Sequence, residues 1–145
     1  MGWEYTHVAI DDHSRLADDE VLADETAETT AGVLRCAVAW YAAQGIAVEP
    51  LPTDDGSADR SHHFAHVALE LGISHRFTQA YRPQTNGKAE RFIRTLLTEC
   101  AYATAYGRAA RRTAALPTDL TCYDFYRRHS ARNDALPASR LPIAV

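Results

Sequence analysis

Strand-type and helix-type patterns alternate along this 145-residue chain in an order that leaves few folds open. Aromatic and β-branched residues at 3–10 predict a strand, and 16–22 predicts its hairpin partner, although the acids at 18–20 are poor strand formers. Helix, strand, helix, strand and helix patterns then follow within residues 26–106. This order predicts an α/β domain, in which helices pack on a mixed β-sheet.

The predicted helices differ in how clearly their ends are marked. Residues 26–44 and 61–71 place apolar side chains at helical spacing, and each segment is followed by a glycine. A third, long helix is expected over 86–106, with one apolar stripe in the core. The stripe consists of Phe92, Ile93, Leu96 and Leu97. Residues 107–117 are predicted as a basic connector and 120–129 as a short helix, with an irregular C-terminal end.

The two remaining strand candidates are short. Residues 46–53 form the first, which ends directly before the Asp-Asp-Gly sequence at 54–56, and residues 73–78 form the second. Pro50 and Pro52 conflict with the first assignment, because each proline removes an N–H donor from a strand that is expected to be buried and paired.

Composition is that of one ordinary globular domain, with 46% hydrophobic and 23% charged residues. No segment approaches the roughly 20 apolar residues that span a bilayer, and no secretion signal is visible, so a cytoplasmic protein without a membrane partner is expected. The three cysteines are widely spaced, with no pair suited to zinc or redox chemistry. Cys36, Cys100 and Cys122 are therefore expected to be reduced, buried thiols.

Charge is divided unevenly along the chain. Residues 1–59 carry 13 acidic and 2 basic side chains, whereas residues 60–145 carry 6 acidic and 13 basic ones, most of them arginine. An arginine-rich half with interleaved tyrosines suits contacts to DNA phosphates. Electrostatic pairing between the two halves of the chain accounts for the asymmetry equally well.

Asp54 and Glu90 are the acidic residues whose positions most favour a role in a functional site. Asp54 ends a predicted strand before a glycine turn, Glu90 lies in the first turn of an amphipathic helix, and 35 residues separate them. Open α/β sheets place functional groups at strand ends, and hard divalent cations take oxygen ligands from several segments, so a metal–carboxylate site is a reasonable prediction. His62 and His66 offer a second possibility, a zinc-type histidine pair, against the alternative of exposed polar residues on a helix.

Three segments, in this order, carry a family resemblance: THVAIDDHSR, TDDGSADRSHHF and LGISHRFTQAYRPQTNGKAERFIRTLL. They resemble the catalytic core of the integrase and insertion-sequence transposase superfamily over nearly the whole chain. The third segment resembles the family's sequence around its catalytic glutamate, and TDDG resembles the TDNG box that carries its second catalytic acid. The spacing between Asp54 and Glu90 is also typical of the family.

The resemblance implies a ribonuclease H-like fold and metal-dependent hydrolysis and strand transfer on DNA phosphodiesters. Asp54 and Glu90 match two of the family's three carboxylates, which bind two Mg²⁺ or Mn²⁺ ions. Basic residues near Glu90 either contact DNA phosphates or form only a solvated helix face. They are Arg82, Lys88, Arg91 and Arg94. The expected division is a partial catalytic core at 1–110 and a basic helical tail at 111–145.

The chain also departs from the family's pattern. The family's first catalytic Asp lies on a strand upstream of the one that resembles 3–10, so the sheet is expected to lack its first, central strand and to leave two edges unpaired. Asp11 and Asp12 lie in the next turn, and Asp11 is a candidate third ligand, against a turn-forming role. The segment 123–130 resembles the family's Tyr-Asn and Arg-Pro-His pattern, with Asp124 in the place of Asn.

Two functions fit these observations. The first is a transposase or integrase core that acts on DNA, with a homo-oligomer or an intact transposase as partner, and that is inactive as this truncated chain. The alternative is a non-catalytic transposase remnant with a non-specific DNA-binding or partner-binding surface. The presence of a third metal carboxylate in the folded chain separates the two. An unrelated metal-binding or structural α/β domain would leave the three matching segments as coincidence.

Overall fold

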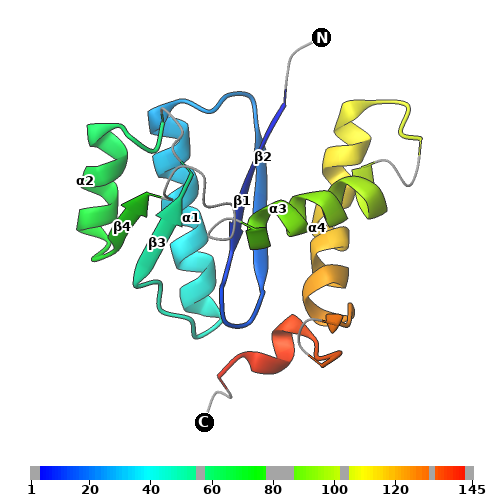
Figure 1. Cartoon of the computed structure of the whole chain (residues 1–145). Coiled ribbons are helices and arrows are strands. Elements are labelled where there is room, and N and C mark those ends of the chain that lie inside the picture. The colour runs from blue at the N-terminus through cyan, green and yellow to red at the C-terminus, as the bar shows by residue number, and fades with distance from the viewer. Residues whose placement is uncertain (1–3, 55–57, 78–86, 102–104, 131–132, 143–145) are drawn as a thin grey trace. The chain divides into compact units, whose positions relative to one another are not determined.

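Strands and helices follow one another in the order that the sequence predicts (Figure 1). The structure, a computed structural model, describes residues 4–54, 58–77, 87–101, 105–130 and 133–142. The chain divides into two compact units. Unit 1 comprises Met1–His7, Glu20–Gly87 and Pro142–Val145, and unit 2 comprises Val8–Asp19 and Lys88–Leu141.

Unit 1 is built on two capped helices and a pair of strands. Helix α1 (Ala27–Ala43) begins after Thr26, whose side chain accepts a hydrogen bond from the Thr29 N–H, and α2 (His62–Glu70) begins after Ser61, which accepts one from the Phe64 N–H. Both predicted helices are confirmed. The buried apolar residues of α1, α2 and the start of the last strand form the core: Ala31, Leu34, Phe64, Val67, Ala68 and Ile73.

Strand β3 (Pro50–Thr53) pairs in parallel with β4 (Ser74–Phe77). The Ser74 N–H donates to the Glu49 carbonyl at 2.9 Å, so that carbonyl faces β4. Because hydrogen-bonding direction alternates along a strand, Leu51 and Thr53 direct their N–H groups to β4, and the prolines at 50 and 52 fall where an N–H would face away. The prolines are therefore tolerated, but β3 is shorter than predicted and only half-buried at alternate residues, not fully buried.

Strands β1 (Tyr5–Ile10) and β2 (Ala17–Leu22) form the predicted hairpin, despite the three acids in β2. Its turn half, Val8–Asp19, belongs to unit 2 and its open half to unit 1. The described strands make two two-stranded sheets, β1–β2 and β3–β4, in place of the one mixed sheet that the sequence predicts. Among the strands that the structure describes, β1 and β3 each pair with another strand on one side only.

Unit 2 packs α3 (Gly87–Leu96) and α4 (Ala109–Phe125) around the turn half of the hairpin. Its buried residues are Ala17, Phe92 and Leu96. The predicted stripe on α3 is wrong in part, since Ile93 and Leu97 are each 40% exposed. The α-helix gives way to a π-helical turn, η2 (Leu97–Ala101), and does not continue to Tyr106, because residues 105–106 are irregular.

Helix α4 corrects the prediction of a connector at 107–117 and a short helix at 120–129. One helix covers most of both segments, with Pro117 in its interior. The run before Pro117 consists largely of alanine and arginine, strong helix formers, and a proline removes a single N–H donor from the ladder. The predicted irregular C-terminal end contains a 3₁₀ turn, η4 (Pro137–Arg140).

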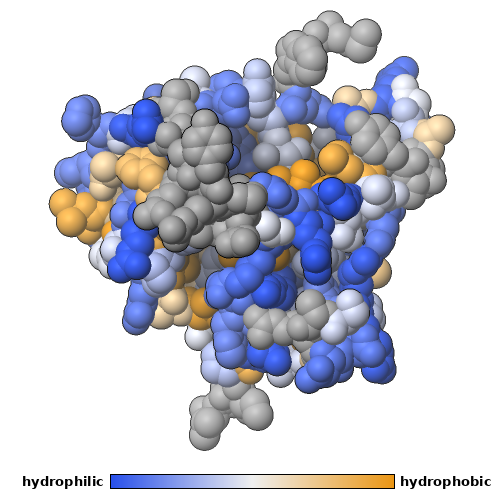
Figure 2. All heavy atoms as spheres, viewed as in Figure 1, coloured by the Kyte–Doolittle hydropathy of each residue, from blue (hydrophilic) through white to orange (hydrophobic). Residues whose placement is uncertain are grey.

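The surface carries both polar and apolar areas. Figure 2 shows hydrophobic side chains over α2 and β4, whose exposed apolar residues are Leu69 and Phe77. Cys36 and Cys122 are exposed free thiols and not the buried ones that were predicted. Within the described ranges, no helix combines the length and the apolar character that crossing a membrane requires.

Candidate active site

Asp54 follows the last residue of β3 and exposes its side chain to solvent. Its carboxyl group is hydrogen-bonded to the carboxyl of Asp59, which also accepts a hydrogen bond from Thr53. Burial of Asp59, together with the hydrogen bond to Asp54 and the negative charge there, raises the pKa of Asp59 to about 7. The end of β3 therefore carries two carboxyl groups in direct contact.

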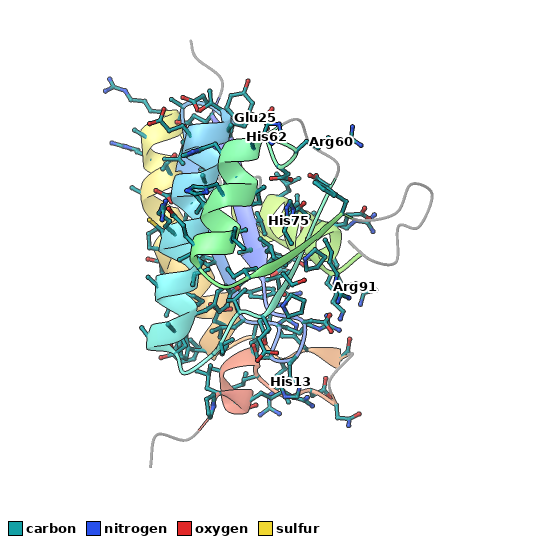
Figure 3. The ribbon with its side chains drawn as sticks, turned by 90° about the vertical axis from the view of Figure 1, so that its left-hand side faces the viewer. His13, Glu25, Arg60, His62, His75 and Arg91 are labelled. Atoms are coloured by element: carbon teal, nitrogen blue, oxygen red, sulfur yellow. The ribbon has the colours of Figure 1, made fainter. Side chains whose placement is uncertain are left out.

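His75 lies on the same face of the β3–β4 sheet as Thr53. Its Nε2 is 2.8 Å from Thr53 Oγ1. Its imidazole, labelled in Figure 3, contacts two aromatic rings, with centroid distances of 5.0 Å to Phe64 of α2 and 4.6 Å to Phe77 of β4. Burial lowers the pKa of His75 below its ordinary value of 6.5, so the ring is neutral at neutral pH.

Glu90 lies in unit 2, in the first turn of α3, and its side chain is exposed. Arg91 and Arg94 on the same helix are also exposed, and Arg82 lies outside the described residues. The structure thus brings Asp54 together with Asp59 in unit 1, and it places Glu90 among arginines in unit 2.

The turn between β1 and β2 bears on the role of Asp11. Asp11 Oδ2 accepts hydrogen bonds from the Ser14 N–H and from the Ser14 hydroxyl, both at 2.7 Å. Asp12 is 81% exposed and forms ion pairs with Arg15, at 3.5 Å, and with Lys88. These contacts close the turn, and they favour the turn-forming alternative for Asp11. Lys88, a predicted DNA-binding residue, contacts a carboxylate of its own unit.

Oxygen ligands are the kind that Mg²⁺ and Mn²⁺ take, and the carboxyls of Asp54, Asp59 and Glu90 fit that chemistry. Among the residues that the structure describes, no three His, Cys, Asp or Glu side chains come together in a way that could hold a metal ion. The zinc alternative gains no third ligand either. His66 Nε2 instead lies 3.1 Å from Glu70 Oε1 at the surface, as expected for exposed polar residues on a helix.

A buried acid in unit 2 was missed by the sequence analysis. Asp124 is 2% exposed, and its Oδ1 accepts a hydrogen bond from the Ala17 N–H at 2.9 Å. Burial, opposed by that hydrogen bond and reinforced by Asp18 and Asp19, raises the pKa of Asp124 to about 7. Burial and neighbouring acids likewise raise the pKa of Asp19 to about 7. The available signal was the Tyr-Asn pattern, because an Asn at this position would bond the backbone without a charge.

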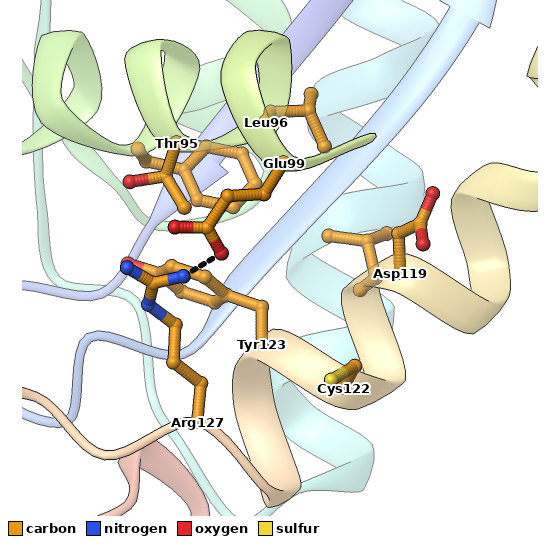
Figure 4. Close-up of a pocket in the computed structure, with 9 residues that line it drawn as sticks. Thr95, Leu96, Glu99, Asp119, Cys122, Tyr123 and Arg127 are labelled. Atoms are coloured by element: carbon orange, nitrogen blue, oxygen red, sulfur yellow. Dashed lines mark hydrogen bonds and ion pairs between the residues drawn. The ribbon is translucent and has the colours of Figure 1, made fainter. Parts of the chain in front are cut away.

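A pocket of about 250 Å³ lies in unit 2 between α3 and α4 (Figure 4). Phe92, Leu96, Leu120 and Tyr123 supply most of its apolar wall, and an ion pair between Glu99 and Arg127 lies at its side. None of the predicted metal ligands or DNA-binding residues lines it, so the pocket is separate from the candidate chemistry.

Comparison with known protein families gives a consistent match along the chain. Two family models, both described as "Integrase core domain", match residues 1–83 and 71–137. A curated relative, the uncharacterized protein K02A2.6 of Caenorhabditis elegans, is 32% identical over 92 residues. That alignment covers 63% of this chain but only 7% of the relative's length.

Two solved structures are similar to this one. A chain of the simian T-cell lymphotropic virus intasome, determined in complex with the PP2A regulatory subunit B56 gamma, gives a TM-score of 0.74 at 20% identity over 97% of this chain and 51% of that chain. The catalytic core domain of BIV integrase gives a TM-score of 0.70 at 24% identity, over 96% of this chain and 87% of that one. The α/β fold is therefore that of the retroviral integrase catalytic core, a ribonuclease H-like fold.

Proposed function

Because the chain belongs to the integrase core domain family, we propose that it is the catalytic core of a DNA transposase or integrase. The observation that carries the proposal is the family match over 1–83, within which Asp54 stands exposed at the end of β3. The integrase fold and the exposed Glu90 on α3 add support. The division at residue 110 and the bacterial insertion-sequence origin form part of the proposal.

The family generally depends on divalent metal ions, and Asp54 and Glu90 are the residues that would hold Mg²⁺ or Mn²⁺ here. A bound divalent ion in such a site stabilises the charge on the entering and leaving oxygens of a phosphodiester. The chain's own residues contribute ligands for the metal and positive charges for the DNA. Asp54 and Glu90 supply carboxylate oxygens, and the exposed Arg91 and Arg94 offer guanidinium groups to DNA phosphates.

We propose further that this chain alone does not cleave DNA. The described residues contain no third carboxylate beside Asp54, and the contacts of Asp11 hold its turn together. The one-sided pairing of β1 and β3 supports the expectation that a strand with the family's first Asp belongs between them. Catalysis then requires this strand and its Asp in addition to the residues described here. The chain's partners are proposed to be DNA, further copies of the chain or an intact transposase.

Mn²⁺ binding to the isolated chain tests the proposed ligands. Electron paramagnetic resonance of free Mn²⁺ measures the affinity of the unmodified chain, of Asp54→Ala and of Glu90→Ala. We expect each substitution to weaken Mn²⁺ binding at least about tenfold, because each removes a direct ligand. Glu49→Ala and Glu28→Ala are matched controls, since both remove exposed acids, one just before β3 and one in the first turn of α1.

A nicking assay on supercoiled DNA with Mn²⁺ completes the test. We expect no cleavage above that of the Asp54→Ala, Glu90→Ala double variant. Metal-dependent cleavage that disappears in the double variant would show that the chain is active and that Asp11 or Asp12 serves as a ligand. Mn²⁺ affinity that neither substitution changes, with DNA binding retained through Arg91 and Arg94, would favour the alternative function, a non-catalytic DNA-binding remnant.

A further inference from the structure

We infer that the pocket between α3 and α4 is a binding site for a small aromatic cation, whose ring packs on the apolar wall and whose charged group faces Asp119. The inference concerns unit 2 alone and does not rest on the proposed function. It depends on three properties of the pocket: its aromatic wall, its size and the charges of the residues that line it.

Helical spacing gathers the apolar wall on two helices. Phe92 and Leu96 are four residues apart on α3, and Leu120 and Tyr123 are three apart on α4, so each pair lies on one side of its helix. The rings of Phe92 and Tyr123 meet edge to face, with their centroids 4.8 Å apart. Phe92 and Leu96 also belong to the buried core of unit 2. Core packing therefore fixes the wall in the absence of a ligand.

The size and the rings of the pocket favour a small aromatic ligand. Its volume of about 250 Å³ is below the range of roughly 300–1,000 Å³ in which larger organic ligands bind, so one aromatic ring with a short polar group is a suitable size. Aromatic side chains pack favourably against another ring, and their faces attract cations. Burial raises the pKa of Tyr123 to about 12, so its ring carries no charge at neutral pH.

The charges in the lining favour a cation over an anion. Two acids and one arginine line the pocket: Glu99, Asp119 and Arg127 (Figure 4). Arg127 forms an ion pair with Glu99, so these two charges offset each other. Among the described residues, Asp119 takes part in no ion pair. Arg15 and Arg91 act electrostatically on the ring of the α4 wall, but neither lines the pocket. The carboxylate of Asp119 is therefore available to a cationic ligand.

Acids close to Asp119 strengthen this preference. Burial, together with the negative charges of Asp18 and Asp119, raises the pKa of Asp19 in β2 to about 7. Within the described ranges, Asp19 Oδ2 is also buried without a hydrogen-bond partner. Asp119 thus lies where carboxyl groups already repel one another. A cation bound beside Asp119 relieves that repulsion, whereas an anion in the pocket adds to it.

Three probes of nearly the same shape test the preference for positive charge. Benzamidine is a cation, benzamide is neutral and benzoate is an anion. Titration of the ¹⁵N-labelled full chain, followed by its amide NMR signals, measures the affinity and locates each probe. We expect benzamidine to shift the signals of Phe92, Leu96, Leu120 and Tyr123 and to bind about three- to fivefold more tightly than benzamide, as one partly exposed charge pair provides. Benzoate is expected to bind most weakly.

Substitution of Asp119 tests where the cationic group lies. Asp119→Asn removes the charge and keeps the shape of the side chain. We expect the variant to bind benzamidine no more tightly than benzamide and to bind benzamide as the unmodified chain does. Asp134→Asn is the matched control, because Asp134 is an exposed acid of the same unit that does not line the pocket. It should leave all three affinities unchanged.

Several outcomes would overturn the inference. Equal affinities for benzamidine and benzamide, or tighter binding of benzoate, would show that the pocket does not select a cation. Benzamidine that shifts no signal of α3 or α4 would show that it binds elsewhere. A benzamidine affinity that Asp119→Asn leaves unchanged would show that Asp119 does not face the charged group. None of these results bears on Mn²⁺ binding by Asp54 and Glu90, so the proposed function is tested separately.

Discussion

The two units of this molecule differ in the composition of their interiors and in how their helices begin. The core of unit 1 is apolar, and both of its helices start at a residue whose side chain caps the first turn. Unit 2 buries Asp124 beside its apolar residues, and α4 starts at Arg108 without a side-chain cap. In unit 1 the acid whose pKa is raised to about 7 is Asp59, near the surface at the end of a strand. In unit 2 an acid with a similarly raised pKa, Asp124, lies in the interior.

This difference indicates which unit has a stability that depends on pH. Burial of hydrocarbon side chains does not change with protonation, so the core of unit 1 is insensitive to pH by this route. A buried carboxyl is tolerated best when it is neutral, and Asp124 and Asp19 lie close enough for their charges to affect each other. We therefore expect the interior of unit 2 to weaken as the pH rises, and the following experiments test that contrast.

Removal of one buried aromatic ring from each unit is expected to have the largest effect. Phe64 is 3% exposed in unit 1 and Phe92 is 1% exposed in unit 2. Each substitution to alanine is expected to lower the free energy of unfolding by about 3–5 kcal/mol, measured by urea denaturation. Ile93→Ala, at a residue that is 40% exposed on the same helix as Phe92, is the control and should cost about 1 kcal/mol. Equal costs for Phe92→Ala and Ile93→Ala would show that unit 2 is not held by apolar packing.

Asp124→Asn is expected to stabilise the protein at high pH only. The folded-state pKa, about 7, lies above the ordinary value of 3.8, so the unfolded chain releases its proton first as the pH rises. Stability from this group is complete below about pH 4 and is lost by about pH 7. Asparagine keeps the bond to the Ala17 N–H without a charge, so the variant should gain about 4 kcal/mol at pH 8 and almost nothing at pH 4.

Urea denaturation at a series of pH values measures this gain. Asp134→Asn is the matched control, because it removes an exposed acid of the same unit and should change the profile little. A gain from Asp124→Asn that is the same at pH 4 and pH 8 would contradict the assignment of a neutral, buried Asp124.

The smallest effect is expected at the helix starts. Ser61→Ala removes the bond from the Phe64 N–H and should lower stability by about 1 kcal/mol. Arg108→Ser offers α4 a cap that it lacks and should raise stability by about 0.5–1 kcal/mol, with the same urea assay as the measurement. A loss of stability in Arg108→Ser would mean that the arginine makes a contact more valuable than a cap.

Local sequence signals predicted unit 1 better than unit 2. Thr26 and Ser61 act through neighbours three residues away, so spacing alone locates both helix starts. The helix through Pro117 depends on strong helix formers on its N-terminal side, and a proline is a misleading stop signal there. The split of α3 into a buried and an exposed side depends on the neighbours that cover it, which no pattern within α3 reveals.

The candidate site could be predicted only where it depends on one segment. Asp54 was placed at a strand end from the residues on either side of it, and the structure confirms that position. The contact between Asp54 and Asp59 does not follow from spacing within one helix or strand, and the bond between Thr53 and His75 depends on strand register. Such contacts need the tertiary fold, so the sequence offered the acids but not their pairing.

The prolines of β3 give one edge of its sheet an unusual chemistry. On the side away from β4, Pro50 and Pro52 present carbonyl groups but no N–H groups. A second strand arriving there can donate hydrogen bonds but receives none from these two residues. A copy of β3 would meet only acceptors, since its own outward edge has the same defect. Pairing of this edge with a second copy of β3 is therefore disfavoured, whereas pairing with a different strand that supplies N–H donors is favoured.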